Sequence, residues 1–138
     1  MASAYEKPTP IIDVRSKPWW EAVRRHELLI QSCEDCGHLT FPPAPSCPRC
    51  RRTRLRWIPA SGFGKIWSWT VFHKAYFPGF KSEIPYAVAI VELDEGPRIW
   101  TQIEALALAD YRIGLPVVAF FDAVTDDLTL VKFKPIDQ

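Results

Sequence analysis

Four cysteines form the clearest chemical pattern in the sequence, because they are arranged as two Cys-x-x-Cys pairs. Cys33 and Cys36 form the first pair, Cys47 and Cys50 form the second, and ten residues lie between the pairs. Two thiolates at this spacing can bind one metal ion from a tight turn, and two such turns complete a tetrahedron of sulfur ligands. The pattern predicts a metal site with no open coordination position, which makes its role structural rather than catalytic.

Four thiolates favour zinc, and iron bound by the same four sulfur ligands is the alternative metal. Disulfides and inert free thiols are the alternatives without a metal. The first ten residues contain no apolar stretch typical of a secretory signal, so the sequence offers no support for an oxidising compartment. We therefore expect reduced, zinc-bound cysteines and a cytoplasmic location. His38 lies between the pairs, but four thiolates already fill the tetrahedron.

Arginines are concentrated around the second cysteine pair, and they have two possible roles. Four thiolates on a divalent metal leave a charge of about −2, which nearby guanidinium groups would offset. Guanidinium groups also match the oxygens of a phosphate, so the same residues are candidates for a phosphate site. Both interpretations stay open for the five residues Arg49, Arg51, Arg52, Arg54 and Arg56.

Composition limits the class of protein that carries these residues. The chain has 138 residues, 48% hydrophobic and 24% charged, with a net charge of +1, which fits one domain or two very small ones sharing an interface. Residues 1–60 carry a net charge of +4 and residues 61–138 carry −3, so we expect two modules joined near Pro59 to Gly64. The balanced total weakens a generic nucleic-acid interpretation, and no apolar run approaches the roughly 20 residues of a membrane span.

The residues before the cysteines predict a short helix followed by a strand. Ser16 can cap the helix, and Pro18 lies in its first turn, where the missing N–H costs little. Trp19 and Val23, with His26, share one helical face, and Trp20 lies beside it. Two large aromatics on a surface helix must be buried, either on their own domain or in the groove of a partner protein.

Short strands are expected on both sides of the first cysteine pair, over residues 28–30 and 39–41. After Gly64 the apolar residues alternate, which predicts strands over residues 65–73, 86–93, 98–104, 117–122 and 129–134. Five strands with a helical or irregular link between the third and the fourth suit a small closed barrel of the OB type.

The segment 74–85 is too long for a hairpin turn and contains Tyr76, Phe77 and Phe80. It is either a binding loop with exposed aromatics or a flap that covers the barrel. No catalytic set is visible, because the three histidines are scattered and the chain has no nucleophile elbow or phosphate-binding glycine loop. We therefore predict no catalytic residue on this chain.

The order of these motifs closely resembles that of the small zinc-ribbon and OB-fold proteins described as acyl-CoA-associated. The resemblance covers the chain from about Pro18 to Pro135. Where relatives often carry a glycine two residues before the Leu28-Leu29 pair, this chain has His26. The motifs that carry the resemblance are the Trp19-Trp20 helix, Leu28 to Gly37, Phe41-Pro42-Pro43, Cys47 to Cys50, Ser61 to Gly64, Ile84-Pro85-Tyr86, Glu92 to Pro97, Gly114 to Val117 and Lys132 to Pro135.

The resemblance implies a mainly β fold with a short N-terminal helix, a rubredoxin-like zinc ribbon and a five-stranded OB-fold barrel. We place an N-terminal helical segment at 1–27, the ribbon at 28–60 and the OB-fold domain at 61–138. Members of this family act as partners of thiolase-fold enzymes, or are paired with MaoC-type hydratases, in hetero-oligomers. The catalytic residues of these assemblies look to lie on the partner, and the ribbon and OB-fold subunit bridges subunits and helps form the path of the CoA thioester.

The chain is accordingly expected to be an accessory subunit of a thiolase-fold acyl-CoA enzyme complex, with Trp19, Trp20 and the aromatics of residues 76–80 as candidate partner contacts. Arg49, Arg51, Arg52 and Lys65 are candidate contacts for the phosphates of CoA. An alternative is a single-stranded nucleic-acid-binding module, since Trp67 and Trp69 are expected on one face of a strand. The negative charge of the barrel half disfavours that alternative. A free-standing aldolase or thioesterase is a further alternative, disfavoured by the missing nucleophile motif.

Overall fold

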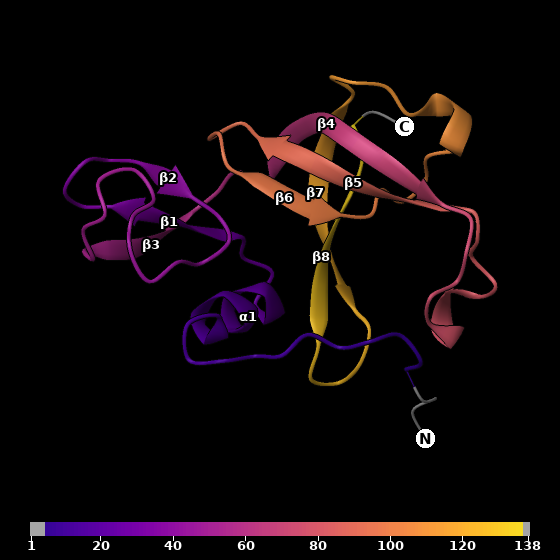
Figure 1. Ribbon diagram of the computed structural model, residues 1–138, viewed down its shortest axis with the longest axis horizontal. Helices are drawn as coiled ribbons and strands as arrows, with labels where there is room; N and C mark the ends of the chain where they lie inside the picture. The colour runs from indigo at the N-terminus through magenta and orange to yellow at the C-terminus, as the bar shows by residue number, and fades with distance from the viewer. Residues whose placement is uncertain (1–4, 137–138) are drawn as a thin grey trace.

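The computed structural model describes residues 5–136 and shows a mainly β protein with one short helix (Figure 1). A three-stranded antiparallel sheet has the order β2-β1-β3, and a five-stranded sheet has the order β6-β5-β4-β7-β8. No helix of residues 5–136 is long and apolar enough to cross a membrane. The elements are α1 (Lys17–Arg24), β1 (Leu29–Cys33), β2 (Leu39–Thr40), β3 (Leu55–Pro59), β4 (Phe63–Phe72), η1 (Pro78–Phe80), β5 (Tyr86–Leu93), β6 (Arg98–Thr101), η2 (Leu108–Asp110), β7 (Pro116–Ala123) and β8 (Thr129–Pro135).

The helix α1 begins where the sequence predicts, with proline in its first turn. Ser16 is the N-cap residue, as predicted, but its side chain makes no capping hydrogen bond. The carboxylate of Asp13 instead accepts a hydrogen bond of 2.8 Å from the backbone N–H of Ser16, and the Ser16 hydroxyl oxygen accepts one of 3.1 Å from the N–H of Asp13. The bond from the Ser16 backbone lowers the pKa of Asp13. Two short polar side chains thus stabilise the turn that leads into the helix.

The inner face of α1 is buried against its own protein. Trp19, Ala22 and Val23 are at most 8% exposed, while Trp20 is half-buried. Trp19 is therefore buried on its own protein and not in the groove of a partner. Its indole ring packs edge-on against Trp20 with ring centroids 4.6 Å apart, and it also meets Phe41 of the ribbon at 5.5 Å.

His26 occupies a backbone conformation that suits glycine. Its φ of 62° lies in the left-handed region, which glycine adopts without strain. The imidazole stacks on the ring of Phe121 in β7, with centroids 5.2 Å apart and planes within 7° of parallel. This ring contact offsets part of the conformational cost and joins the end of α1 to the five-stranded sheet.

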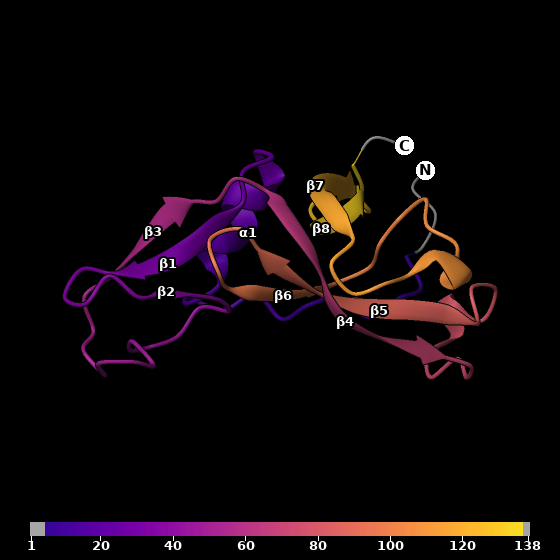
Figure 2. The ribbon, with the colours of Figure 1, turned by 90° about the horizontal axis from the view of Figure 1, so that it is seen from above.

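The ribbon sheet contains both predicted strands and one that was not predicted. β1 pairs with β2 through Gln31 and Ser32, and with β3 along its whole length, from the Leu29–Pro59 pair to the Cys33–Leu55 pair. Figure 2 shows this ribbon sheet set beside the five-stranded sheet. The unpredicted strand, β3, leads directly from the arginine-rich segment into the second sheet.

All five strands expected after Gly64 are present, and together they form a curled sheet. β4 pairs with β5 along most of its length but with β7 only at Phe63, Gly64 and Lys65. The sequence predicted a closed barrel, but the sheet is a half-barrel, because the part of β4 after Lys65 does not pair with β7. One parallel bridge between Ile103 and Phe133 joins the chain after β6 to β8 across the open side. β7 and β8 stand across β4 and β5 in Figure 2.

Close contact between β4 and β5 depends on Gly64. A Cβ atom there would lie 2.6 Å from the carbonyl oxygen of Glu92, which no real side chain tolerates. The core of the half-barrel contains fully buried side chains from four strands, and the cluster extends to α1 and β1. Its fully buried members on the sheet include Ile66, Val91, Val117 and Phe133.

Candidate metal centre and ribbon cleft

The four cysteines meet at one end of the ribbon. The Sγ atoms of Cys33 and Cys50 are 3.6 Å apart, those of Cys36 and Cys47 are also 3.6 Å apart, and all four lie within 4.8 Å of one another. A tetrahedral zinc ion with Zn–S bonds of about 2.3 Å separates its sulfur ligands by about 3.8 Å. The cluster therefore fits a zinc ion with four thiolate ligands, which is a structural site.

Each cysteine pair lies on a turn closed by backbone hydrogen bonds. The N–H of Gly37 donates to the carbonyl of Cys33, and the N–H of Arg51 donates to the carbonyl of Cys47, both at 2.8 Å. Gly37 and Arg51 follow the second cysteine of their pairs and both have left-handed φ angles, 78° and 68°. The two turns thus share one backbone shape, which glycine adopts freely and arginine adopts under strain.

Backbone donors also act on the sulfur atoms. The N–H groups of Cys50 and Arg49 point at Sγ of Cys47 at 3.5 and 3.4 Å. The donor at Cys50, together with the one at Arg49, lowers the pKa of the Cys47 thiol to about 6 although burial opposes this. These donors therefore favour the thiolate of Cys47, which is the form that binds metal.

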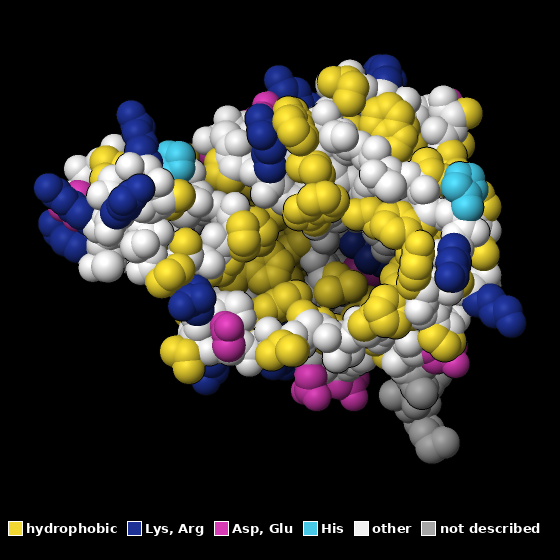
Figure 3. All heavy atoms as spheres, viewed as in Figure 1, with side chains coloured by type: hydrophobic (Ala, Val, Ile, Leu, Met, Phe, Trp, Pro, Cys, Tyr) yellow, Lys and Arg dark blue, Asp and Glu magenta, His cyan; other side chains and the backbone are white. Residues whose placement is uncertain are grey.

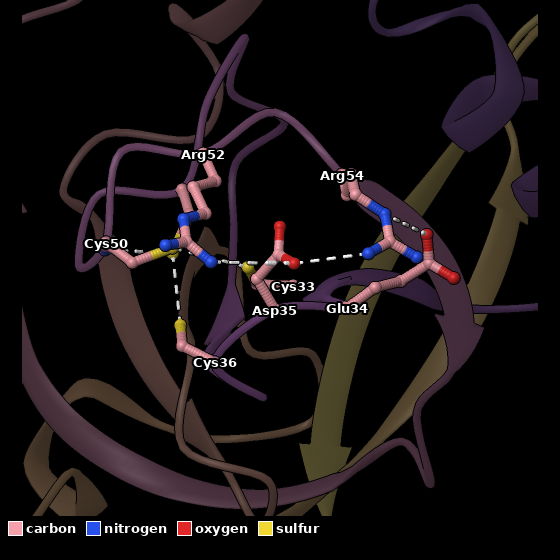
Figure 4. Close-up of polar contacts among 8 residues, drawn as sticks. Cys33, Glu34, Asp35, Cys36, Cys50, Arg52 and Arg54 are labelled. Carbon is pink, nitrogen blue, oxygen red and sulfur yellow. Dashed lines mark hydrogen bonds and ion pairs between the residues drawn. The ribbon is translucent and has the colours of Figure 1, made fainter.

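Acidic residues of the first turn pair with arginines that follow the second turn (Figure 4). Asp35, whose side chain is 16% exposed, lies 3.2 Å from Arg54 and 3.8 Å from Arg52, and Glu34 lies 3.9 Å from Arg54. Two of the five arginines are therefore engaged within the ribbon, where they link its two halves. Exposed pairs of this kind contribute at most about 1 kcal/mol each.

Arg49 faces a different environment from its neighbours. It lines a cleft of about 600 Å³ between the ribbon turn at Gly37–Phe41 and the turn joining β5 to β6. The same cleft contains His38 and Arg98, and sequence reasoning missed Arg98 because 48 intervening residues separate it from Arg49. Arg51, Arg52 and Lys65 are not among the residues that line this cleft. Of the four predicted phosphate contacts, this cleft therefore contains Arg49 alone among the described residues.

Arg98 is held firmly in this cleft. Its guanidinium group lies 3.9 Å from the centroid of the Trp67 ring and 3.2 Å from the carboxylate of Glu92. Trp69, in contrast, packs on the core beside Tyr111, with ring centroids 5.6 Å apart. The expectation that Trp67 and Trp69 share one face is wrong, because the strand is irregular between Ile66 and Ser68, which changes the alternation. The aromatic platform of a single-stranded nucleic-acid site is not formed by this pair.

The loop 74–85 combines the two roles considered for it. Phe80 lies against the molecule, with its ring stacked on Tyr86 at 4.8 Å between centroids and the Lys7 ammonium 4.7 Å from its centroid. Tyr76 and Phe77 remain 63% and 50% exposed. Half of the loop therefore acts as a flap, and its tip presents two aromatic side chains on the surface.

Comparison with known proteins agrees with this architecture. Residues 20–56 match the family model described as ChsH2, rubredoxin-like zinc ribbon domain, and residues 57–122 match the one described as ChsH2, C-terminal OB-fold domain. A probable enoyl-CoA hydratase alpha subunit of Thermomonospora curvata is 38% identical over 129 residues, which are 94% of this chain and 40% of that protein. The chain thus spans well under half the length of this relative.

Two further proteins are similar over nearly their whole length. A DUF35 domain-containing scaffold protein of Methanocaldococcus jannaschii is 38% identical over 88% of this chain and 91% of its own. A solved structure named Ltp2-ChsH2(DUF35) aldolase contains a chain with 38% identity and a TM-score of 0.83, with 92% of this chain and 98% of that chain covered.

The fold and the four-cysteine centre define a zinc-ribbon and OB-fold protein. Because the similarity extends over nearly all of the archaeal scaffold protein, the chain belongs to the DUF35 family. The resemblance noted from the sequence motifs and the fold class expected from it are both confirmed.

Proposed function

We propose that this chain is an accessory subunit that bridges a thiolase-fold acyl-CoA enzyme complex, with the catalytic residues on the partner. One observation carries the proposal: 92% of this chain matches one chain of the solved structure named Ltp2-ChsH2(DUF35) aldolase, and that name joins two proteins. The names of a hydratase alpha subunit and of a scaffold protein point to the same class of assembly. A MaoC-type hydratase is the other partner that fits these names.

The residues of the chain fit such a role. The closed metal site makes the ribbon rigid, and exposed apolar side chains gather in segments outside the core, as interfaces require. Ile11 and Val14 are each 92% exposed, and Tyr76 and Phe77 are exposed at the tip of the loop. Cysteines kept free for zinc suit a reducing compartment, so the proposal places the complex in the cytoplasm.

Assembly tests this proposal. Affinity purification of the tagged chain from its own host, with identification by mass spectrometry, is expected to yield a thiolase-fold or hydratase partner in stoichiometric amount. The double variant Tyr76→Ala/Phe77→Ala is expected to weaken the complex by roughly 30-fold or more, because a single interface aromatic that is a hot spot contributes about 2 kcal/mol or more.

Phe63→Ala is the matched control, because Phe63 is an aromatic of 46% exposure at the opposite end of β4. It is expected to leave the complex intact, and both variants are expected to retain zinc and the unfolding midpoint of the parent. Purification of the chain with nucleic acid alone would contradict the proposal. An unchanged complex with the double variant would contradict the assignment of the loop as a contact.

We also propose that Arg49, Arg51, Arg52 and Lys65 contact the phosphates of CoA when the complex binds its thioester. All four are exposed on the surface, and Arg49 lies in the cleft with Arg98. Replacing the four by alanine is expected to raise KM for the thioester at least tenfold while kcat changes little, because binding is lost equally from ground and transition states.

Arg56→Ala serves as the control for this measurement, since Arg56 is an exposed ribbon arginine outside the proposed set. It is expected to leave KM unchanged. An unaltered KM in the fourfold variant would remove the phosphate role and would leave the three arginines the role of offsetting the charge of the metal centre.

A further inference from the structure

The segment before α1 crosses the molecule and reaches the loop 74–85. In Figure 1 it runs from α1 past the turn between β7 and β8 towards η1. Ile12 of this segment lines a small pocket with Asp127 and Thr129, which lie at that turn. Within residues 5–15 only Tyr5 and Lys7 are partly buried, so the segment is held at the end that reaches the loop.

Three contacts join this end of the segment to the loop. The Lys7 ammonium lies 4.7 Å from the centroid of the Phe80 ring, and it also pairs with the carboxylate of Glu83. The third contact is made by the backbone, because a Cβ atom at Gly79 would lie 2.8 Å from the carbonyl carbon of Glu6 and from the backbone nitrogen of Lys7. The peptide bond between Glu6 and Lys7 therefore lies directly on Gly79, and a larger residue there would displace it.

The loop depends on side-chain contacts for its position. The backbone hydrogen bonds of residues 77–83 join residues three apart, so they close turns within the loop and do not connect it to the sheet. Phe80 stacks on Tyr86 of β5. Tyr76 meets Phe72 of β4 edge to face, with ring centroids 6.2 Å apart. A segment held mainly by side chains opens locally at a lower free energy than a core strand.

The contacts from the N-terminal segment act next to the exposed tip of the loop. Tyr76 and Phe77, which are 63% and 50% exposed, immediately precede η1, the turn that contains Gly79 and Phe80. Figure 3 shows hydrophobic side chains at the surface over both segments, along the lower edge and the right-hand side of this face. A displacement of η1 would therefore also move the two exposed rings.

We propose that residues 5–12 form a strap that holds the loop 74–85 in one conformation before a partner binds. A cation–π contact or an exposed ion pair is weak alone, but the three contacts act together on residues 79–83. A loop that is already ordered binds without the entropic cost of ordering it. The effect on partner binding rests on the proposed function, in which Tyr76 and Phe77 contact the partner, whereas the ordering of the loop is a property of this chain alone.

Amide hydrogen exchange of the zinc-loaded full chain tests the strap without any partner. Gly79→Ala places a methyl group where the peptide bond between Glu6 and Lys7 lies. It is expected to speed exchange of the amides of residues 79–84 about tenfold or more, while the amides of β4 and β5 keep the rates of the parent. Ser82→Ala is the matched control, because it introduces the same residue at an exposed position of the same loop, and it is expected to change nothing.

Lys7→Ala separates the strap from a local effect of the substituted glycine, because Lys7 lies outside the loop, and it also replaces Gly79→Ala if that variant does not fold. It is expected to speed exchange of the same amides about threefold or more. Lys81→Ala removes an exposed lysine of the loop itself and is expected to have no effect. Parent rates in both Gly79→Ala and Lys7→Ala would overturn the proposal. Faster exchange throughout β4 and β5 would also overturn it, since the contacts would then support the whole sheet.

Affinity for the partner obtained by the purification described above separates the strap from the proposed function. Gly79→Ala is expected to weaken the complex about threefold or more, because the loop is displaced in most of the molecules. Faster exchange in the loop with an unchanged complex would support the strap and contradict the loop as a partner contact. A weakened complex with parent exchange rates would overturn the strap, because the substituted residue would then act on the partner directly.

Discussion

The variant Cys47→Ser is expected to contain no stoichiometric zinc and to have an unfolded ribbon. Cys47 is 1% exposed, and its Sγ is the one that two backbone N–H groups approach, so a serine oxygen there replaces the most enclosed ligand. Zinc binding to structural four-ligand sites has an apparent free energy of about 10–16 kcal/mol, which equals or exceeds the total stability of about 5–15 kcal/mol typical of a domain. The short strands β1 to β3 cannot replace that contribution.

Metal analysis and amide hydrogen exchange measure the result. Protection of the amides in β1 and β3 is expected to be lost in Cys47→Ser and, equally, when a strong chelator removes the metal from the parent chain. The control is His38→Ala, since His38 lies between the cysteine pairs but takes part only through its backbone, whose carbonyl accepts from the N–H of Cys33 and whose N–H acts on the Cys36 thiol. Loss of zinc from His38→Ala would show that the ligand set contains a histidine.

Short-range patterns in the sequence predicted most of the fold. The cysteine spacing identified the metal centre, since both turns are local structures whose geometry depends on four or five residues. Alternation of apolar residues located all five strands of the half-barrel. The strand β3 was missed because its arginines suggested a charged surface, although Leu55, Trp57 and Ile58 are its half-buried residues.

Long-range features were beyond that reasoning. Arg98 reaches the cleft of Arg49 only because the β5–β6 turn packs beside the ribbon, and no local pattern encodes this approach. The irregularity at Trp67 shifts the alternation by one residue without a glycine or proline to mark it. The left-handed conformation of His26 was not predicted either, because a histidine does not mark such a position.

The variant Trp19→Ala is expected to lower the free energy of unfolding by about 3–5 kcal/mol, the range for truncating a large buried aromatic. The sequence suggested both tryptophans of α1 as partner contacts, but Trp19 is 8% exposed and belongs to the core cluster. Trp20 is only partly buried beside it, so Trp20→Ala is expected to cost well under half as much. Urea denaturation with an unchanged m-value measures both differences.

Trp19→Phe separates the two contributions of this residue. It retains most of the buried ring, and it removes an indole N–H that has no partner among the described residues, so the desolvation penalty of that group disappears as well. We therefore expect Trp19→Phe to lose much less stability than Trp19→Ala. Equal losses for Trp19→Ala and Trp20→Ala would contradict the buried position of Trp19. If Trp19→Ala releases a partner, the cause would be the destabilised core and not a lost contact. The exposed loop residues, and not this tryptophan, therefore test the interface.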